Sequence, residues 1–192
     1  FTSFASMVNK DLNDVLGNFV NRVLKMTASK FSPAVPDGSD WGELENAFVA
    51  TLQQRVTDYA SYLEKMEFRK AVNELRAIWV EGNNYLTQAA PWTVIKEDRD
   101  RAAMILRLSL NVIRLYAMLS MPVIPDACKK IADLLEIDAD SLTWVKTDVK
   151  DELRALPAGK AFKVPEEPIF KKITPEQVAD LSERYGAPKD AE

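Results

Sequence analysis

Histidine is absent from this 192-residue chain, and cysteine occurs once, at Cys128. Without an imidazole, the usual activation of a serine or cysteine nucleophile is excluded, and so is histidine general-base catalysis. A lone cysteine cannot form an internal disulfide, and the shortage of both residues argues against a metal site. Cys128 lies in the helical pattern DACKKIADLL, where we expect it to act as a small buried apolar residue.

Long uninterrupted apolar runs are also missing. Arginine, asparagine or proline interrupts each candidate before it reaches the length of a membrane span. The first residues lack the basic start and apolar centre of a signal peptide. We therefore expect a cytoplasmic location and no contact with a membrane. Because the chain begins without methionine and directly in a periodic pattern, we also expect it to be part of a longer protein.

Glycine is scarce, with six residues, and no stretch alternates convincingly between polar and apolar residues as a strand does. Apolar residues instead recur at steps of three and four. This spacing predicts an all-α fold, a bundle of about five helices in a domain over residues 1–145. An extended tail over 146–192 follows, with a short final helix near 174–187 that Thr174 caps and Pro175 opens. The predicted bundle helices cover 3–30, 41–64, 67–87, 97–119 and 126–136.

The helical spacing also predicts which side chains are buried. In the first helix the expected apolar stripe consists of Phe4, Val8, Leu12, Val15, Phe19 and Val23. In the third helix the inward residues are expected to be Phe68, Val72, Leu75, Trp79 and Leu86. Asp40 followed by Glu43 resembles a capping box at the start of the second helix.

One polar stripe of the first helix contains Asp11, Asp14, Asn18, Arg22 and Lys25. The planar groups of Asn18 and Arg22 lie one turn apart and can each form paired hydrogen bonds, as base edges require. A nearby aromatic ring would complete a site for an unpaired base, stacking on its face while polar groups contact its edge. The alternative is an ordinary solvated helix face.

Trp92, one of four tryptophans, follows Pro91 at the end of the stretch NNYLTQAAPW. Proline ends a helix and restricts the local backbone. A tryptophan at such a corner can cover the bundle core. It can also be held ready for a partner, because a stiff corner reduces the ordering that binding requires.

Three stretches resemble bacterial methionyl-tRNA synthetases. KDLNDVLGNFVNRVLKM, residues 10–26, contains D-L-x-x-x-L-G-N-x-x-x-R of the first helix after the catalytic region. Residues 83–92 are similar to the pattern N-x-Y-L-x-x-A-x-P-W, and VPEEPIFKKI, residues 164–173, to a closing P-x-P-L-F-x-x-I. The three stretches occur in the family's order and together span residues 10–173.

The resemblance implies an anticodon-binding helix bundle. It assigns recognition of the methionine anticodon to Asn18, Arg22 and Trp92, with Trp92 stacking on the first anticodon base and Pro91 holding the corner. Asp14, one turn before Asn18, is a further candidate. The implied parent enzyme ligates methionine to its tRNA with ATP, whereas this part needs no cofactor and should be inactive alone.

The resemblance also implies that residues 156–173 pack against the missing catalytic domain of the same protein, through Phe162, Val164, Ile169 and Phe170. Without that domain these side chains could be exposed or turned onto the bundle. We expect a monomer, because no further oligonucleotide-binding barrel follows. The net charge of −4 leaves two other interpretations open. One is a helical protein-interaction module, and the other is the anticodon bundle of a related class I synthetase.

Overall fold

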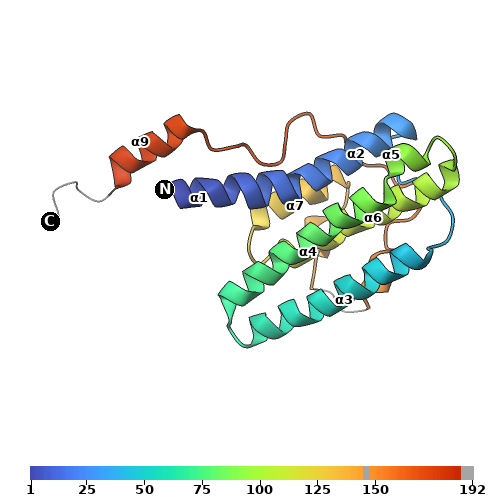
Figure 1. The fold of residues 1–192 in the computed structure, drawn as a ribbon, viewed down its shortest axis with the longest axis horizontal. Helices are drawn as coiled ribbons and strands as arrows, with labels where there is room; N and C mark the ends of the chain where they lie inside the picture. The colour runs from blue at the N-terminus through green and yellow to red at the C-terminus, as the bar shows by residue number, and fades with distance from the viewer. Residues whose placement is uncertain (145–147, 187–192) are drawn as a thin grey trace.

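The computed structural model describes residues 1–144 and 148–186, which form an all-α bundle (Figure 1). The main helices of the bundle are α2 (Asn18–Lys30), α3 (Glu43–Glu64), α4 (Phe68–Ala89), α6 (Arg99–Ser120) and α7 (Pro125–Leu134). The other elements are α1 (Thr2–Met7), η1 (Val8–Gly17), α5 (Pro91–Val94), η2 (Ala139–Ser141), α8 (Val149–Glu152) and α9 (Pro175–Tyr185). The predicted fold class is confirmed, and the ends of each predicted helix lie within two residues of those observed.

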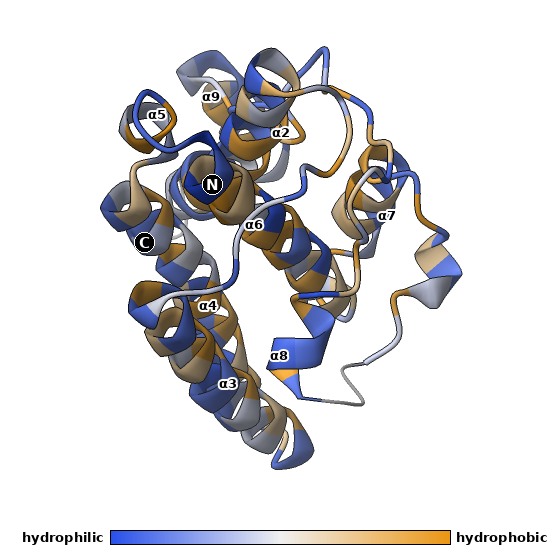
Figure 2. Cartoon of the chain, turned by 90° about the vertical axis from the view of Figure 1, so that its right-hand side faces the viewer, coloured by the Kyte–Doolittle hydropathy of each residue, from blue (hydrophilic) through white to orange (hydrophobic). Residues whose placement is uncertain are grey.

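Helix α6 forms the centre of the bundle. In Figure 2 it lies between α2, α4 and α7, and it contacts all three. Its 22 residues are long and apolar enough to cross a membrane, with a mean hydropathy of 1.5 over the best window, but 89% of that window is buried inside the bundle. Ala103, Leu106, Leu110, Ile113 and Met118 of this helix are all buried. The apolar character of α6 is therefore explained by its place in the core.

The first helix contains a π-helical segment, η1, between α1 and α2. A π-helix bonds each amide to the carbonyl five residues earlier and so makes wider turns than an α-helix. Side chains before and after the segment therefore no longer lie on the same face of the helix, as the regular spacing of an α-helix would place them. This explains why the predicted stripe fails at its start. Phe19 and Val23 are fully buried, whereas Phe4 is 54% exposed.

The predicted inward face of α4 is correct except for its first two members. Leu75, Trp79 and Leu86 are buried, but Phe68 and Val72 are exposed. These two residues lie in the first turns of α4, where the α3–α4 hairpin projects beyond the rest of the bundle (Figure 1). Helical spacing describes the face correctly but cannot show where neighbouring helices stop covering it.

The N-cap of α3 lies two residues after Asp40, the residue proposed for that position from the sequence. This N-cap is Gly42, whose N–H donates to the Glu45 carboxylate over 2.9 Å. Glu45 is fully buried and also accepts from Tyr85 and Arg101. The capping interaction is therefore made by a buried carboxylate that binds two other helices as well, which the sequence spacing does not reveal.

Residues 160–173 of the tail lie along the bundle. The Val35 N–H donates to the Lys160 carbonyl, and the Phe162 N–H donates to the Pro33 carbonyl. Phe162 is only 4% exposed, and Ile169 and Phe170 pack against the core, so three of the four proposed tail anchors contact this chain itself. Val164 remains exposed. The proposed domain boundary at 145/146 lies outside the described residues and stays a prediction.

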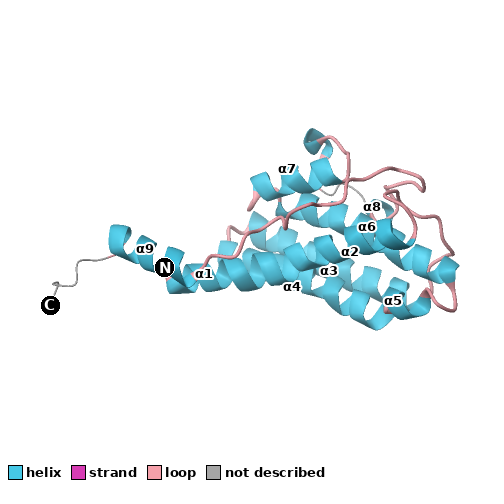
Figure 3. Cartoon of the chain, turned by 90° about the horizontal axis from the view of Figure 1, so that it is seen from above, coloured by secondary structure: helices cyan, strands magenta, loops and turns pink. Residues whose placement is uncertain are grey.

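The final helix of the tail, α9, projects past the amino-terminal end of the bundle (Figure 3). It begins with Thr174 as its cap, as predicted, and Gln177 completes a capping box that was not predicted. The Thr174 side chain accepts from the Gln177 N–H, the Gln177 side chain accepts from the Thr174 N–H, and Pro175 occupies the first helical position.

Cys128 is fully buried in α7, as expected, and this burial raises the pKa of its thiol to about 12. Only the thiolate reacts with alkylating reagents. At pH 8 we therefore expect iodoacetamide to modify the folded chain about a thousandfold more slowly than the chain unfolded in guanidinium chloride. Mass spectrometry over time measures both rates, and the single cysteine makes the result unambiguous. Similar rates in the two states would contradict burial of the thiol.

Candidate nucleic-acid interface

The corner that presents Trp92 is built by three consecutive backbone features. Helix α4 ends at Ala90, which adopts the left-handed conformation with φ of 42°. Such a residue commonly terminates a helix, although glycine is more usual there. Pro91 then occupies the first position of α5 and is buried. The Thr93 and Val94 amides both donate to the Ala90 carbonyl, which closes the turn.

Trp92 and Arg22 lie against each other at this corner. The guanidinium carbon of Arg22 is 5.2 Å from the centroid of the Trp92 ring, within the range of a cation–π interaction. Trp92 remains 39% exposed and is absent from the buried core cluster. The side chain therefore does not act as a closed lid on the core. A planar cation and a planar aromatic ring are presented together to solvent.

Asn18 completes the surface on α2. It lies one helical turn before Arg22, so the two side chains share a face of the helix. Both are exposed. Among the described residues, the Asn18 side chain has no hydrogen-bond partner, so its amide is available to a ligand. We name Asn18, Arg22 and Trp92 the reading surface. Its three members come from two segments more than 60 residues apart in the sequence.

Asp14 occupies a different environment from the rest of the predicted site. Its carboxylate pairs with Lys172 of the tail over 2.9 Å and accepts from Asn13. The hydrogen bond from Lys172, followed by that from Asn13, lowers the pKa of Asp14 below its usual value. Because the carboxylate already has two partners within the protein, Asp14 contacts the tail, and a direct contact with a ligand stays a prediction.

The stretches that carried the resemblance in the sequence meet around η1 and α2. From the second stretch, the Asn83 side chain donates to the Val15 carbonyl over 3.1 Å. From the third stretch, Phe170 packs against Gly17, where an added Cβ would lie 3.1 Å from the ring. Their clustering indicates that they belong to one structural unit. The sequence patterns identified Asn18, Arg22 and Trp92 but did not show that the tail reaches the same helix.

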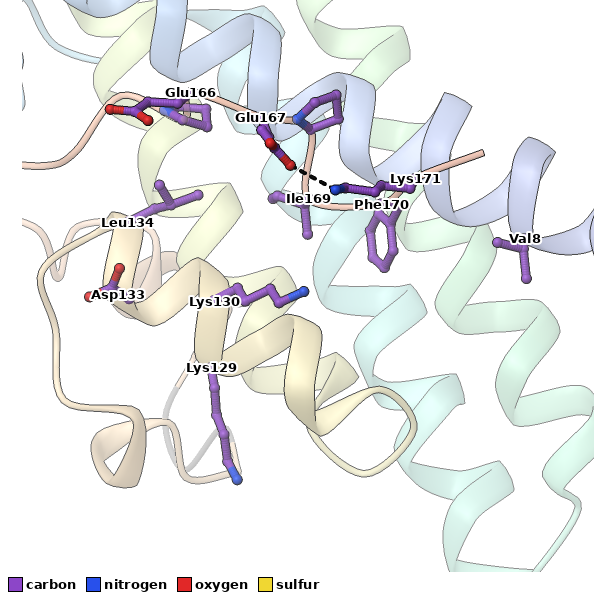
Figure 4. Close-up of a pocket in the computed structure, with 12 residues that line it drawn as sticks. Val8, Lys129, Lys130, Asp133, Leu134, Glu166, Glu167, Ile169, Phe170 and Lys171 are labelled. Carbon is purple, nitrogen blue, oxygen red and sulfur yellow. Dashed lines mark ion pairs between the residues drawn. The ribbon is translucent and has the colours of Figure 1, made fainter. Parts of the chain in front are cut away.

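A large groove lies elsewhere, between α7 and the tail (Figure 4). It has a volume of about 910 Å³, and Leu134, Ile169 and Phe170 contribute to its apolar lining. None of the described residues that line it belongs to the reading surface. Because Asn18, Arg22 and Trp92 are all exposed, the candidate interface is an open surface, as suits a base that stacks on a ring. In the described part of the chain, no group of histidine, cysteine or carboxylate side chains is arranged to hold a metal ion.

Comparisons with known proteins identify the family. Residues 35–190 match the family described as the anticodon binding domain of methionyl tRNA ligase. The methionine–tRNA ligase of Caulobacter vibrioides is 50% identical over 183 residues, which is 95% of this chain and 32% of that protein. The corresponding ligase of Ruegeria sp. is 50% identical over 189 residues, which is 98% of this chain and again 32% of the relative.

Solved structures agree on the fold. The free-state crystal structure of Mycobacterium tuberculosis methionyl-tRNA synthetase matches with a TM-score of 0.75 at 23% identity, covering 89% of this chain and 34% of that one. A structure of the same protein bound to methionyl-adenylate gives a TM-score of 0.76.

The family match excludes Asn18 and Arg22, which precede residue 35, but includes Trp92. The alignments to curated relatives extend over nearly the whole chain. The match is to the methionyl family, which sets aside the anticodon bundle of another class I synthetase. The chain spans about a third of the length of these relatives, and it belongs to the anticodon-binding domain family of the methionyl-tRNA ligases.

Proposed function

We propose that the reading surface binds the anticodon loop of the tRNA that accepts methionine. Trp92 stacks on the unpaired first anticodon base, while Asn18 and Arg22 form hydrogen bonds with base edges. The observation that carries this proposal is the contact between Arg22 and the exposed Trp92 ring. It places a stacking group beside planar hydrogen-bonding groups, as recognition of a single-stranded base requires.

The energies of these contacts are large enough for discrimination. Stacking of a base on an aromatic side chain contributes about 1–3 kcal/mol. A bidentate contact with a base edge discriminates by about 1–3 kcal/mol in duplex recognition. Together they would separate a correct anticodon from an altered one by about two to four powers of ten.

The surroundings of the surface suit an RNA loop better than the net charge suggests. Arg22 and Lys25 are both exposed on α2, and Arg22 contacts the Trp92 ring, whereas Asp11 and Asp14 are neutralised by Arg76 and Lys172. Part of the acidic excess lies after residue 174, and α9 projects away from the bundle (Figure 3). Phosphates that approach α2 therefore meet positive charge.

The longer protein is proposed to be a methionine–tRNA ligase that uses ATP. Support comes from the curated relatives with that name and from the methionyl-adenylate held by the Mycobacterium tuberculosis protein. Within that enzyme this part would select the tRNA, and the partner of the bundle would be the catalytic domain of the same polypeptide. A monomeric state and a cytoplasmic location stay predictions.

Titration with two RNA stem-loops tests the proposed function. One carries the methionine anticodon, and the other differs only at the first anticodon base. At about 50 mM salt, where phosphate contacts are strong, we expect the matched loop to bind at least about tenfold more tightly. Fluorescence anisotropy of the labelled RNA measures both Kd values. Equal affinities, or no binding of either loop, would contradict the proposal, and equal affinities would favour a less specific interaction module.

A further inference from the structure

The π-helical segment η1 ends immediately before the reading surface. The backbone N–H of Asn18 donates to the Asn13 carbonyl, five residues earlier, so Asn18 is attached directly to the π-helical hydrogen-bond pattern. Four residues later, Arg22 is held by a regular α-helix whose neighbours Phe19 and Val23 are fully buried. The position of Asn18 therefore depends on η1, whereas the position of Arg22 depends on the packing of α2 against the core.

A π-helix of ten residues is unusual, because such turns normally occur singly within α-helices. Contacts from outside the segment must hold it against reversion to an α-helix. On the α4 side, the Arg76 side chain pairs with Asp11 over 2.6 Å, and Asn83 donates to the Val15 carbonyl. These contacts fix one flank of η1 to the bundle.

The tail holds the other flank through residues 170–173, which we name the tail strap. The Asn9 side chain donates to the Ile173 carbonyl over 2.9 Å, and the Ile173 N–H donates back to the Asn9 amide oxygen over 2.8 Å. The strap runs antiparallel to η1, so that Lys172 pairs with Asp14 further along the segment.

Phe170 makes the last strap contact, at Gly17. A Cβ at Gly17 would lie 3.1 Å from the Phe170 ring and 3.2 Å from the Leu12 carbonyl oxygen, which is tighter than ordinary side chains tolerate. The glycine thus allows the ring to approach the backbone at the residue directly before Asn18. Figure 4 shows Phe170 directed from the tail into the space beside η1 and α7.

We propose that the tail strap positions Asn18 for base recognition. By holding η1 in its π-helical form, the strap fixes the Asn18 amide relative to the Arg22–Trp92 pair, which the core already holds. Asn9, Phe170 and Lys172 are then positioning residues that act through Asn18 without contacting RNA. This inference rests on the proposed anticodon function and adds to it a part of the chain about 150 residues away in the sequence.

Two neighbouring lysines provide a matched test. Lys172 pairs with Asp14 of η1, whereas the one ion-pair partner of Lys171 among the described residues is Glu167 within the tail. Lys172→Ala and Lys171→Ala remove the same charge from the same segment. We expect Lys172→Ala to lower the preference for the matched stem-loop by roughly 2- to 30-fold, the usual range for coupling between sites, and Lys171→Ala to leave it unchanged. The exchanged pair Asp14→Lys with Lys172→Asp should restore the preference.

Phe170→Ala and Asn9→Ala test the other two contacts, with Phe170→Leu as a milder variant should the alanine variant unfold. The effect of each should disappear when Asn18→Ala is already present, because a positioning residue cannot act through a side chain that is absent. Hydrogen exchange of the amides of residues 8–18 provides a second measurement that needs no RNA. We expect faster exchange in the strap variants and unchanged exchange in Lys171→Ala.

The outcomes separate this inference from the proposed function. Should the unmodified chain discriminate between the loops while the strap variants discriminate equally well, the strap proposal is overturned and the anticodon function stands. Strap effects that persist in the Asn18→Ala background also overturn it. Should the unmodified chain not discriminate, the proposed function fails and the positioning role falls with it, while the exchange of residues 8–18 shows whether the strap still holds η1.

Discussion

Trp92→Ala is expected to remove most of the preference for the correct first anticodon base while the fold stays intact. The ring is more than a third exposed and lies outside the buried core, so its loss leaves no core cavity. The lost stacking is worth about 1–3 kcal/mol, which corresponds to a rise in Kd of roughly 5- to 150-fold for the matched stem-loop. Anisotropy titration measures the change, and far-UV circular dichroism confirms the fold.

Trp144→Ala is the matched control for this variant. Trp144 is 37% exposed, nearly the same as Trp92 at 39%, but its ring lies beside that of Tyr59 and it is not a member of the reading surface. We expect this variant to bind both stem-loops like the unmodified chain. Trp92→Phe should retain part of the preference, because a smaller ring still stacks. Equal behaviour of Trp92→Ala and Trp144→Ala would refute a stacking role for Trp92.

Glu45→Ala is expected to destabilise the bundle by about 3–5 kcal/mol, the range for breaking a buried ion pair by removing one partner. The fully buried carboxylate binds the Arg101 guanidinium over 3.0 Å, the Tyr85 hydroxyl over 3.1 Å and the Gly42 N–H over 2.9 Å. Its loss leaves all three donors without this acceptor, at the point where α3, α4 and α6 meet.

Thermal unfolding followed by circular dichroism measures this effect, and we expect the Tm to fall by roughly 10 °C for a chain of this size. Glu43→Ala is the control, because Glu43 lies in the same first turn of α3 but is exposed. Its contribution to the helix dipole is about 0.3–1 kcal/mol. Glu45→Gln should fall between the two, because it keeps the shape and an acceptor for Gly42. A Tm for Glu45→Ala equal to that of Glu43→Ala would show that the buried network contributes little.

Helical periodicity predicted the bundle because its core is assembled from amphipathic helices of ordinary length. Leu75, Trp79 and Leu86 recur at the spacing that places them on one face of α4, and they are buried. Phe68 follows the same spacing and is exposed, because burial also depends on how far neighbouring helices extend. Sequence spacing carries no information about that length.

The π-helical segment could not have been predicted from residue types. The same side chains fit an α-helix, and the choice between the two hydrogen-bond patterns is made by Arg76, Asn83 and residues 170–173, which are distant in the sequence. The members of the reading surface were found through a family resemblance, and their proximity follows from the α4–α5 corner. The buried role of Glu45 had no sequence signal, since a glutamate near a helix start is ordinarily solvated.

Arg22 already covers one face of the Trp92 indole when no RNA is present. A base that stacks on the opposite face would complete a three-layer sandwich of nucleobase, indole and guanidinium, in which Arg22 is free to contact the edge of a neighbouring anticodon base instead of the stacked one. In that arrangement the arginine keeps its place as the base arrives, and the entropy of ordering it has been lost during folding of the protein, before the encounter. The Arg22–Trp92 pair would then be formed before the anticodon loop binds. The association rate would be set by diffusion and by unstacking of the bases in the loop.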